Sequence, residues 1–167
     1  MNYKELIRDV PNFPIAGVLF RDVSPLLQNA EAFAKVAQDF SALVDLKKVD
    51  LFVGIEARGF IFAAQMAAKF GKGFLPVRKA GKLPPPVFQE SYSLEYGSST
   101  LEITPAFKKM NVIICDDVLA TGGTLKASIN LCEKAGYHVS DLLVLINLTF
   151  LNEMKFQGRL VNSLVQY

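Results

Sequence analysis

The stretch of sequence that decides the fold is Val112-Ile-Ile-Cys-Asp-Asp-Val-Leu-Ala-Thr-Gly-Gly-Thr124. Its first four residues are apolar, which predicts a buried strand over residues 112–115. Two aspartates and a turn of small residues then lead into a helix, which we predict from about Gly122 to Ala135, with Gly136 as its stop. A buried strand that leads through a polar turn into a helix is typical of an α/β fold.

The alternation of strands and helices continues on both sides of this stretch. Apolar residues at helical spacing follow Asn29, a good N-cap, and an alanine-rich apolar segment ends near Gly71. We predict helices over residues 30–46 and 60–70, and buried strands over residues 51–55, 74–77 and 142–148. Strand, helix and strand in this order imply right-handed crossovers, so we expect a central parallel sheet that is flanked by helices.

The chain between residues 78 and 103 departs from this alternation. Residues 78–86 contain three lysines or arginines and three consecutive prolines, which neither a helix nor a central strand accommodates, so we predict an exposed loop. Two β-like runs follow at residues 92–96 and 99–103, and Gly97-Ser98 between them predicts a hairpin that turns there.

Length and composition favour a single domain. The 167 residues are 51% hydrophobic, enough to bury a core without disulfides or a structural metal, so we assign residues 1–167 to one domain. A net charge of +2 gives no indication of a nucleic-acid partner. Cys115 and Cys132 lie in apolar segments and are predicted to be buried thiols in a reducing compartment. No apolar run reaches membrane-spanning length, so we expect a cytoplasmic protein with no membrane partner.

The polar breaks after Ile55, Val77 and Cys115 mark the candidate site, because ligands of parallel sheets bind beyond the carboxyl ends of the strands. After the third break, successive backbone N–H groups and two hydroxyls at a helix N-terminus favour a phosphate group. The residues of this predicted phosphate cradle are Ala120, Thr121, Gly122, Gly123 and Thr124. No Lys-Ser or Lys-Thr follows the glycines at the spacing of a Walker A loop, and Gly71-Lys-Gly73 lacks the third glycine of a dinucleotide site.

Asp116 and Asp117 precede the cradle, separated from it by two residues, and their carboxylates can accept hydrogen bonds from vicinal sugar hydroxyls. A phosphate site next to a site for ribose hydroxyls indicates ribose 5-phosphate. The alternative is a solvated strand end followed by an ordinary N-cap and turn.

The order of the whole motif resembles the phosphoribosyl pyrophosphate signature of the type I phosphoribosyltransferases. Four further segments are similar to the adenine branch of that family: Gly17–Asp22, Gly54–Phe62, Val77–Pro84 and Tyr92–Gly97. The resemblance implies a small N-terminal hood with an adenine-binding segment (residues 1–28) and a flexible lid loop and hairpin (residues 78–103). The implied reaction converts adenine and phosphoribosyl pyrophosphate into AMP and pyrophosphate, as in purine salvage.

The resemblance also implies roles for residues that would meet pyrophosphate. In the Glu56–Gly59 loop Arg58 offers a forked cation to pyrophosphate, and the peptide between Glu56 and Ala57 can be cis. Arg78, Lys79 and Lys82 match basic residues that meet pyrophosphate as a loop closes over it. The alternative for these exposed charges is simple solvation.

For the base, the resemblance implies that Phe20 stacks on adenine while the backbone of Leu19 and Arg21 contacts the ring edge and Leu148 covers the opposite face. Phe20 and Leu148 could instead be ordinary core residues. Glu95 matches a loop glutamate that accepts or supplies a proton at adenine N7, and Tyr96 helps to close the site. The predicted catalytic residues are therefore Glu95, Arg58 and Tyr96.

The implied cofactor is Mg²⁺, held mainly through the substrate with few or no protein ligands, and the implied assembly is a homodimer. Two alternatives remain at this point. One is a regulator that senses phosphoribosyl pyrophosphate without turnover, and the other is a phosphoribosyltransferase for hypoxanthine or guanine.

Overall fold

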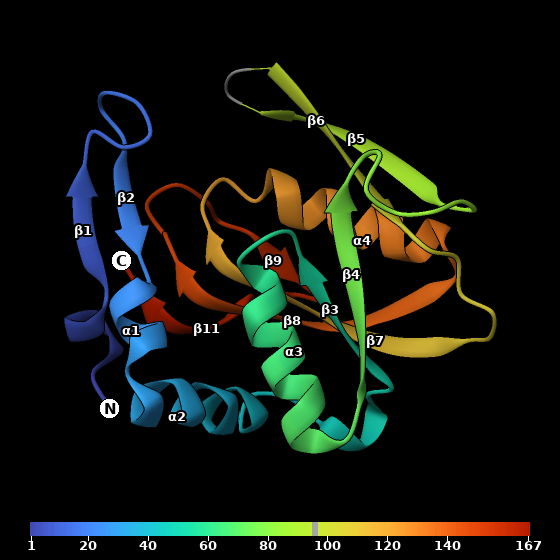
Figure 1. The fold of residues 1–167 in the computed structure, drawn as a ribbon, viewed down its shortest axis with the longest axis horizontal. Coiled ribbons are helices and arrows are strands. Elements are labelled where there is room, and N and C mark those ends of the chain that lie inside the picture. The colour runs from blue at the N-terminus through green and yellow to red at the C-terminus, as the bar shows by residue number, and fades with distance from the viewer. Residues whose placement is uncertain (95–96) are drawn as a thin grey trace.

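A seven-stranded sheet forms the centre of the protein in a computed structural model that describes residues 1–94 and 97–167 (Figure 1). Its strands are β3 (Leu51–Ile55), β4 (Gly73–Lys79), β5 (Phe88–Leu94), β6 (Gly97–Ile103), β7 (Met110–Leu119), β8 (Tyr137–Asn147) and β11 (Asn162–Gln166). The strand order is β11-β8-β7-β3-β4-β6-β5. The five strands from β11 to β4 are parallel, whereas β6 pairs antiparallel with both β4 and β5. The predicted α/β class with a central parallel sheet is confirmed.

The other elements surround this sheet. The helices are α1 (Ser24–Gln28), α2 (Ala30–Ser41), α3 (Gly59–Phe70) and α4 (Gly123–Lys134), with short 3-10 helices η1 (Tyr3–Leu6) and η2 (Leu46–Lys48). Two small antiparallel pairs join β1 (Arg8–Pro11) to β2 (Leu19–Asp22) and β9 (Lys155–Phe156) to β10 (Arg159–Leu160). Among the described residues, no helix combines the length and the apolar character needed to cross a membrane.

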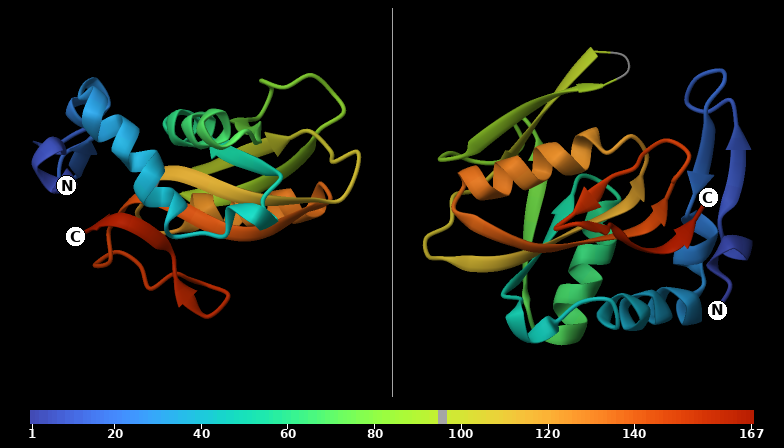
Figure 2. Two further views of the ribbon diagram at one scale, coloured as in Figure 1. Left: turned by 90° about the horizontal axis from the view of Figure 1, so that it is seen from below. Right: turned by 180° about the vertical axis from the view of Figure 1, so that it is seen from behind.

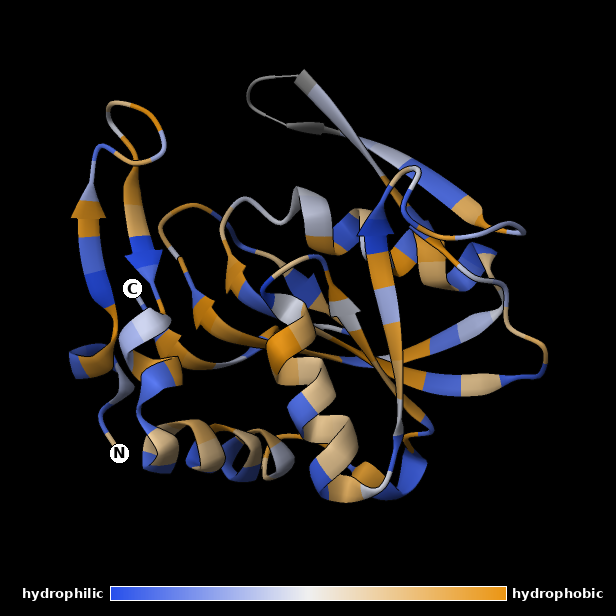
Figure 3. Cartoon of the chain, viewed as in Figure 1, coloured by the Kyte–Doolittle hydropathy of each residue, from blue (hydrophilic) through white to orange (hydrophobic). Residues whose placement is uncertain are grey.

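Helices cover both faces of the sheet and divide the core into two layers (Figure 2). Helices α2 and α3 pack on one face with Phe52 and Ile113, and α4 packs on the other face with Val53 and Ile114. Neighbouring residues of one strand thus enter opposite layers, as the two-residue period of a strand requires. The central strands are mostly hydrophobic, whereas α2 alternates between hydrophobic and hydrophilic positions (Figure 3).

The first predicted helix and the turn of the predicted hairpin differ from expectation. The helix predicted over residues 30–46 ends at Ser41, because Asp45 caps η2 by accepting from the Lys47 N–H at 3.1 Å instead of continuing the helix. The predicted hairpin exists, but Gly97 and Ser98 are not its turn. They belong to β6 and pair with Leu94 and Ser93 of β5.

Strands β4 and β7 are longer than predicted, and this moves predicted site residues from loops into the sheet. Strand β7 continues through Asp116 and Asp117, because its pairing with β8 extends to Leu119 opposite Asn147. Arg78 and Lys79 belong to β4, where they pair with β6. The prediction of a loop beginning at residue 78 is therefore wrong by two residues.

The pattern of the sequence did not indicate two elements, the β1–β2 ribbon and strand β11. In the ribbon, Phe20 pairs with Val10 and Arg21 pairs with Asp9. Strand β11 is a parallel edge strand whose residues pair with β8 from Leu143 to Asn147. Both elements lie on the side of the molecule that carries the two chain ends (Figures 1 and 2).

Candidate active site

A cleft of about 980 Å³ lies beyond the carboxyl ends of β3 and β7. It gathers residues from the ribbon, the loop after β3, the end of β7 and the segment after β8. Of the predicted site residues, it is lined by Leu19, Phe20, Arg21, Arg58, Asp116, Asp117, Ala120, Thr121, Gly123, Thr124 and Leu148. Segments far apart in the sequence are thus brought together where the polar breaks were expected to converge.

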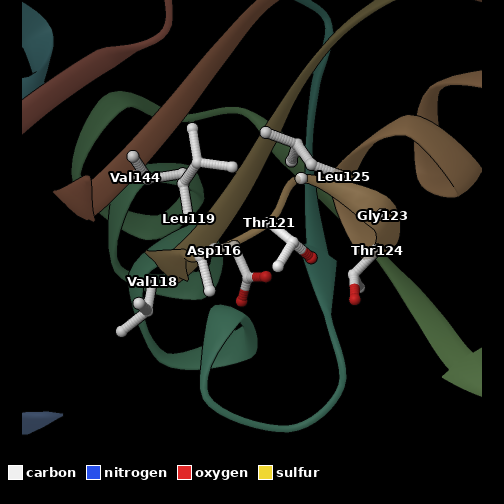
Figure 4. A pocket seen from close by; sticks show the side chains of 10 residues that line it. Asp116, Val118, Leu119, Thr121, Gly123, Thr124, Leu125 and Val144 are labelled. Atoms are coloured by element: carbon white, nitrogen blue, oxygen red, sulfur yellow. The ribbon is translucent and has the colours of Figure 1, made fainter. Parts of the chain in front are cut away.

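The phosphate cradle forms a small pocket of about 70 Å³ at the N-terminus of α4. All five predicted cradle residues, including Gly122, line it. Gly122 has φ of 88°, a left-handed conformation that side chains disfavour, and it turns the chain into α4. The side chains of Asp116, Thr121 and Thr124 present their oxygens on the same side of this turn (Figure 4). The turn therefore offers hydroxyls and the positive end of a helix to an anion.

Helix α3 starts close to the same strand end. A Cβ atom at Gly59 would lie 2.6 Å from the carbonyl oxygen of Cys115 and 3.0 Å from Oδ1 of Asp116. Only glycine fits this approach, so the first turn of α3 packs directly against β7. The peptide between Glu56 and Ala57 in the preceding loop is cis, as the resemblance implies.

The two aspartates sit in an environment that penalises their charge. Asp117 is 5% exposed, and its Oδ2 lies 2.7 Å from Nε of Arg58. Although this contact is an ion pair, Oδ2 accepts no hydrogen bond from the described residues. Burial raises the pKa of Asp117 although the Arg58 charge opposes the shift. Burial, reinforced by the charge of Asp117, raises the pKa of Asp116.

Aromatic and apolar side chains form the other end of the cleft. The guanidinium carbon of Arg58 lies 4.7 Å from the ring centre of Phe20, and the Phe13 ring meets Phe20 edge-on at 5.1 Å. Leu148, which follows β8, also lines the cleft. Phe20 from the ribbon and Leu148 from the segment after β8 thus line the same cleft.

The basic segment of residues 78–83 does not line the cleft in this structure. Its polar groups converge on Glu56, which itself lines the cleft and whose side chain is 9% exposed. Oε1 of Glu56 accepts from Nζ of Lys82 at 2.6 Å, and Oε2 accepts from Nε of Arg78 at 3.3 Å and from the Lys79 N–H at 3.0 Å. The hydrogen bond from Lys82, with help from Lys79 and Arg78, lowers the pKa of Glu56 to about 2.

A second carboxylate, Glu102, holds the backbone of the same segment. Glu102 is 1% exposed and has no cationic partner among the described residues. It accepts hydrogen bonds from the N–H groups of Gly81, Lys82 and Leu83 at 3.0, 2.6 and 2.6 Å, and from the Gln89 side chain at 3.3 Å. Burial raises the pKa of Glu102, but these hydrogen bonds outweigh it and lower the pKa overall. The basic segment is therefore fixed at both its side chains and its backbone.

Several residues that line the cleft are not among the predicted site residues. Tyr92 of β5 lines it, and the Thr124 hydroxyl donates to the Tyr92 hydroxyl at 3.3 Å. The alternation of polar and apolar residues along the hairpin does not distinguish Tyr92 from its neighbours. Glu95 and Tyr96, both predicted to be catalytic, lie outside the described residues. Among residues 1–94 and 97–167, no three acidic, histidine or cysteine side chains cluster as metal ligands.

Comparisons with known proteins point in one direction. Residues 22–148 match the family model described as the phosphoribosyl transferase domain. The chain is 60% identical over 167 residues to the adenine phosphoribosyltransferase of Bdellovibrio bacteriovorus, with both chains covered completely.

Solved structures agree with the sequence comparison. The adenine phosphoribosyltransferase of Thermoanaerobacter pseudethanolicus superposes with a TM-score of 0.87 at 39% identity, covering 99% of this chain and 98% of that one. The enzyme of Saccharomyces cerevisiae, solved with D-2,5-dideoxy-2,5-imino-altritol 1,6-bisphosphate and adenine, has a TM-score of 0.84 at 37% identity, covering 98% and 95%.

Proposed function

The chain belongs to the phosphoribosyl transferase domain family, and on that premise we propose that its cleft brings adenine and phosphoribosyl pyrophosphate together. The reaction is that of an adenine phosphoribosyltransferase, which yields AMP and pyrophosphate. The full-length similarity of the chain to enzymes of that name supports adenine over other bases as the substrate. The alternative of a sensor without turnover receives no support from these relatives.

The observation that carries the proposal is the arrangement at the end of β7. The cradle offers hydroxyls and a helix N-terminus, and Oδ2 of the nearby Asp117, although ion-paired with Arg58, is buried and accepts no hydrogen bond from residues 1–94 or 97–167. A ribose 5-phosphate would satisfy both, since its phosphate needs donors and its hydroxyls need acceptors. In this proposal Ala120 to Thr124 bind the 5′-phosphate, and Asp116 and Asp117 accept from the ribose hydroxyls.

The base occupies the apolar end of the cleft in the proposed complex. Phe20 stacks on one face of adenine, Leu148 covers the other, and the backbone of Leu19 and Arg21 reaches the ring edge. Stacking fixes the plane of the base, and the backbone contacts fix its rotation within that plane. Adenine N9 is thereby directed towards the anomeric carbon of the ribose.

Attack by N9 on the anomeric carbon forms the new C–N bond while the bond to pyrophosphate breaks, through a transition state with oxocarbenium character. Negative charge grows on the leaving pyrophosphate, so cations near it lower the barrier. Arg58 is already in the cleft for this role. Arg78, Lys79 and Lys82 reach pyrophosphate only after they leave Glu56, which the proposed lid of residues 78–103 would allow. We propose that Glu95 accepts or supplies the proton at adenine N7 while N9 attacks, and that Tyr96 helps to close the site.

The acceptors present fit a divalent cation that is bound mainly through the substrate. Asp116 and Asp117 are the two carboxylates that line the cleft beside the cradle, and they can hold the hydroxyls or waters around such an ion. Bound Mg²⁺ supplies positive charge that neutralises pyrophosphate oxygens.

The remaining proposals concern the setting of the enzyme. Free buried thiols at Cys115 and Cys132 favour a reducing compartment, which supports a cytoplasmic location. A homodimer follows from the family resemblance and from the prevalence of twofold assemblies. Light scattering of the purified protein would distinguish a dimer from a monomer.

A spectrophotometric assay tests the function directly. AMP formation would be followed with adenine, phosphoribosyl pyrophosphate and Mg²⁺, and with hypoxanthine, guanine and a metal-free reaction as controls. Activity with adenine alone supports reaction and base together. Binding of phosphoribosyl pyrophosphate without turnover of any base would replace the enzyme with a sensor.

A further inference from the structure

The β1–β2 ribbon needs support from the rest of the protein. It has only two strands of four residues each, and an isolated two-stranded ribbon is marginally stable in water. Yet it carries Phe20, which lines the cleft. The position of one wall of the cleft therefore depends on what holds the ribbon in place.

Tyr167, the residue after β11, contacts the ribbon through its ring. The guanidinium carbon of Arg21 lies 3.7 Å from the centre of the Tyr167 ring, a stacked cation–π contact. Nζ of Lys4 lies 4.8 Å from the same ring centre. The Arg21 side chain is 10% exposed and pairs with Asp9 across the ribbon. Figures 1 and 2 both place the end of β11 beside the base of β2.

The backbone of Tyr167 is bound to the opposite wall of the cleft. Its N–H donates to the carbonyl of Asn147 at 3.1 Å, and its carbonyl accepts from the N–H of Thr149 at 2.9 Å and from the Thr149 hydroxyl at 2.6 Å. Asn147 and Thr149 are the residues on either side of Leu148. Tyr167 thus binds the segment around Leu148 with its backbone and contacts Arg21, the neighbour of Phe20, with its ring.

We infer that Tyr167 is a positioning residue for the base, setting the separation between Phe20 and Leu148. This inference rests on the proposed function, because it assigns adenine to the space between these two side chains. Tyr167 does not line the cleft, so its effect must pass through Arg21 and the segment around Leu148. The phosphate cradle on α4 does not contact Tyr167 in any hydrogen bond or ring contact of the described residues, so phosphoribosyl pyrophosphate binding should not depend on it.

The test is steady-state kinetics of Tyr167→Ala with each substrate varied in turn. Loss of a partly buried cation–π contact predicts a rise of about tenfold in the KM for adenine. Turnover and the KM for phosphoribosyl pyrophosphate should change by less than about twofold, because the cradle is untouched. Tyr167→Phe keeps the ring and should restore wild-type values.

A matched control separates positioning from general stability. Leu164→Ala removes a partly buried side chain of the same strand, which packs in the core under α2 and α3. It should lower the melting temperature without changing the KM for adenine. An equal rise of both KM values in Tyr167→Ala, an unchanged KM for adenine, or the same kinetic change in Leu164→Ala would each overturn the inference.

Hydrogen exchange provides a readout that does not require activity. Amides of residues 8–22 should exchange faster in Tyr167→Ala than in wild type or Leu164→Ala, and equal exchange would overturn the link. Wild-type protein that is inactive with adenine would refute the proposed function, while the exchange experiment would still decide whether Tyr167 holds the ribbon. Should Tyr167→Ala fail to fold, Tyr167→Leu removes the aromatic ring and carries the same comparisons.

Discussion

The phosphate cradle and the basic segment are both proposed to bind phosphate oxygens, but they differ in whether their binding groups are already engaged by other residues. The cradle is built from a turn at the N-terminus of α4, and its hydroxyls and helix end face a small pocket. The basic segment has its cations engaged by Glu56. A preorganised site binds without first losing a contact, whereas the basic segment must exchange one partner for another. We therefore expect substitutions near the cradle to weaken binding directly, and substitutions around Glu56 to change an exchange equilibrium.

The largest expected effect belongs to the buried acceptor beside the cradle. Asp117→Asn should weaken phosphoribosyl pyrophosphate binding by about 100-fold, because a hydrogen bond to a buried charged group contributes about 2 to 3 kcal/mol. Titration calorimetry of the wild type and the variant measures this change. An unaltered dissociation constant would contradict the ribose-binding role of Asp117.

A smaller effect is expected at Glu102, which fixes the backbone of the basic segment. In Glu102→Gln an NH₂ group would face backbone donors, leaving one or more of them unpaired at a cost of about 2 kcal/mol. The melting temperature should fall, and the KM for phosphoribosyl pyrophosphate should rise about tenfold while the KM for adenine stays constant. If both KM values stayed constant, the basic segment would have no part in binding the anion.

Replacement of Glu56 should favour the binding of Lys82 and Arg78 to pyrophosphate, because Glu56 competes for the same cations. Glu56→Gln removes the charge that engages Lys82 and Arg78, so pyrophosphate should bind about threefold more tightly, as expected from the modest energy of partly exposed ion pairs. Pyrophosphate titration checks this result. Weaker binding would mean that Glu56 orients the cations for the ligand and does not compete with it.

The remaining effect concerns stability at the strand end and not binding. Because burial and Asp117 raise the pKa of Asp116, this carboxyl stabilises the fold at low pH and loses that contribution as the pH rises through its raised pKa. Asp116→Asn should therefore melt about 3 °C higher than wild type at pH 7, with a smaller difference towards pH 4. Melting curves of both proteins between pH 4 and pH 7 test this prediction. A difference in melting temperature that grew on acidification would mean that the pKa of Asp116 is lowered in the fold and not raised.

The two regions also differ in how far the sequence predicts them. Residues 112–124 are contiguous, and strand, aspartates, glycines and helix start follow in the order in which the cradle uses them. The arrangement around Glu56 depends on pairing between distant residues, since Arg78 lies opposite Glu102 only through the register of β4 and β6. Periodicity predicted the hairpin but not this register.

The same limit explains why the contacts of Tyr167 were not predicted. Nothing local in the last residues indicates a parallel strand, because β11 is an edge strand of five residues, of which only Val165 is buried. Its pairing with β8 joins residues 19 positions apart, such as Asn162 and Leu143, and the approach of Tyr167 to Arg21 joins residues 146 positions apart. The resemblance to a known family supplied roles for Phe20 and Leu148, but not the residue that connects them.

The starts of α3 and α4 have a further consequence for the response of the enzyme to its surroundings. Gly59 and Gly123 begin these helices, and both helix ends face the carboxyl edge of the sheet where the cleft lies. Their partial positive charge comes from peptide groups, which do not titrate. Acidification can change the charge of Asp116 or Asp117, but this backbone contribution stays constant. The cleft should thus retain a baseline preference for anions at every pH at which the sheet remains folded.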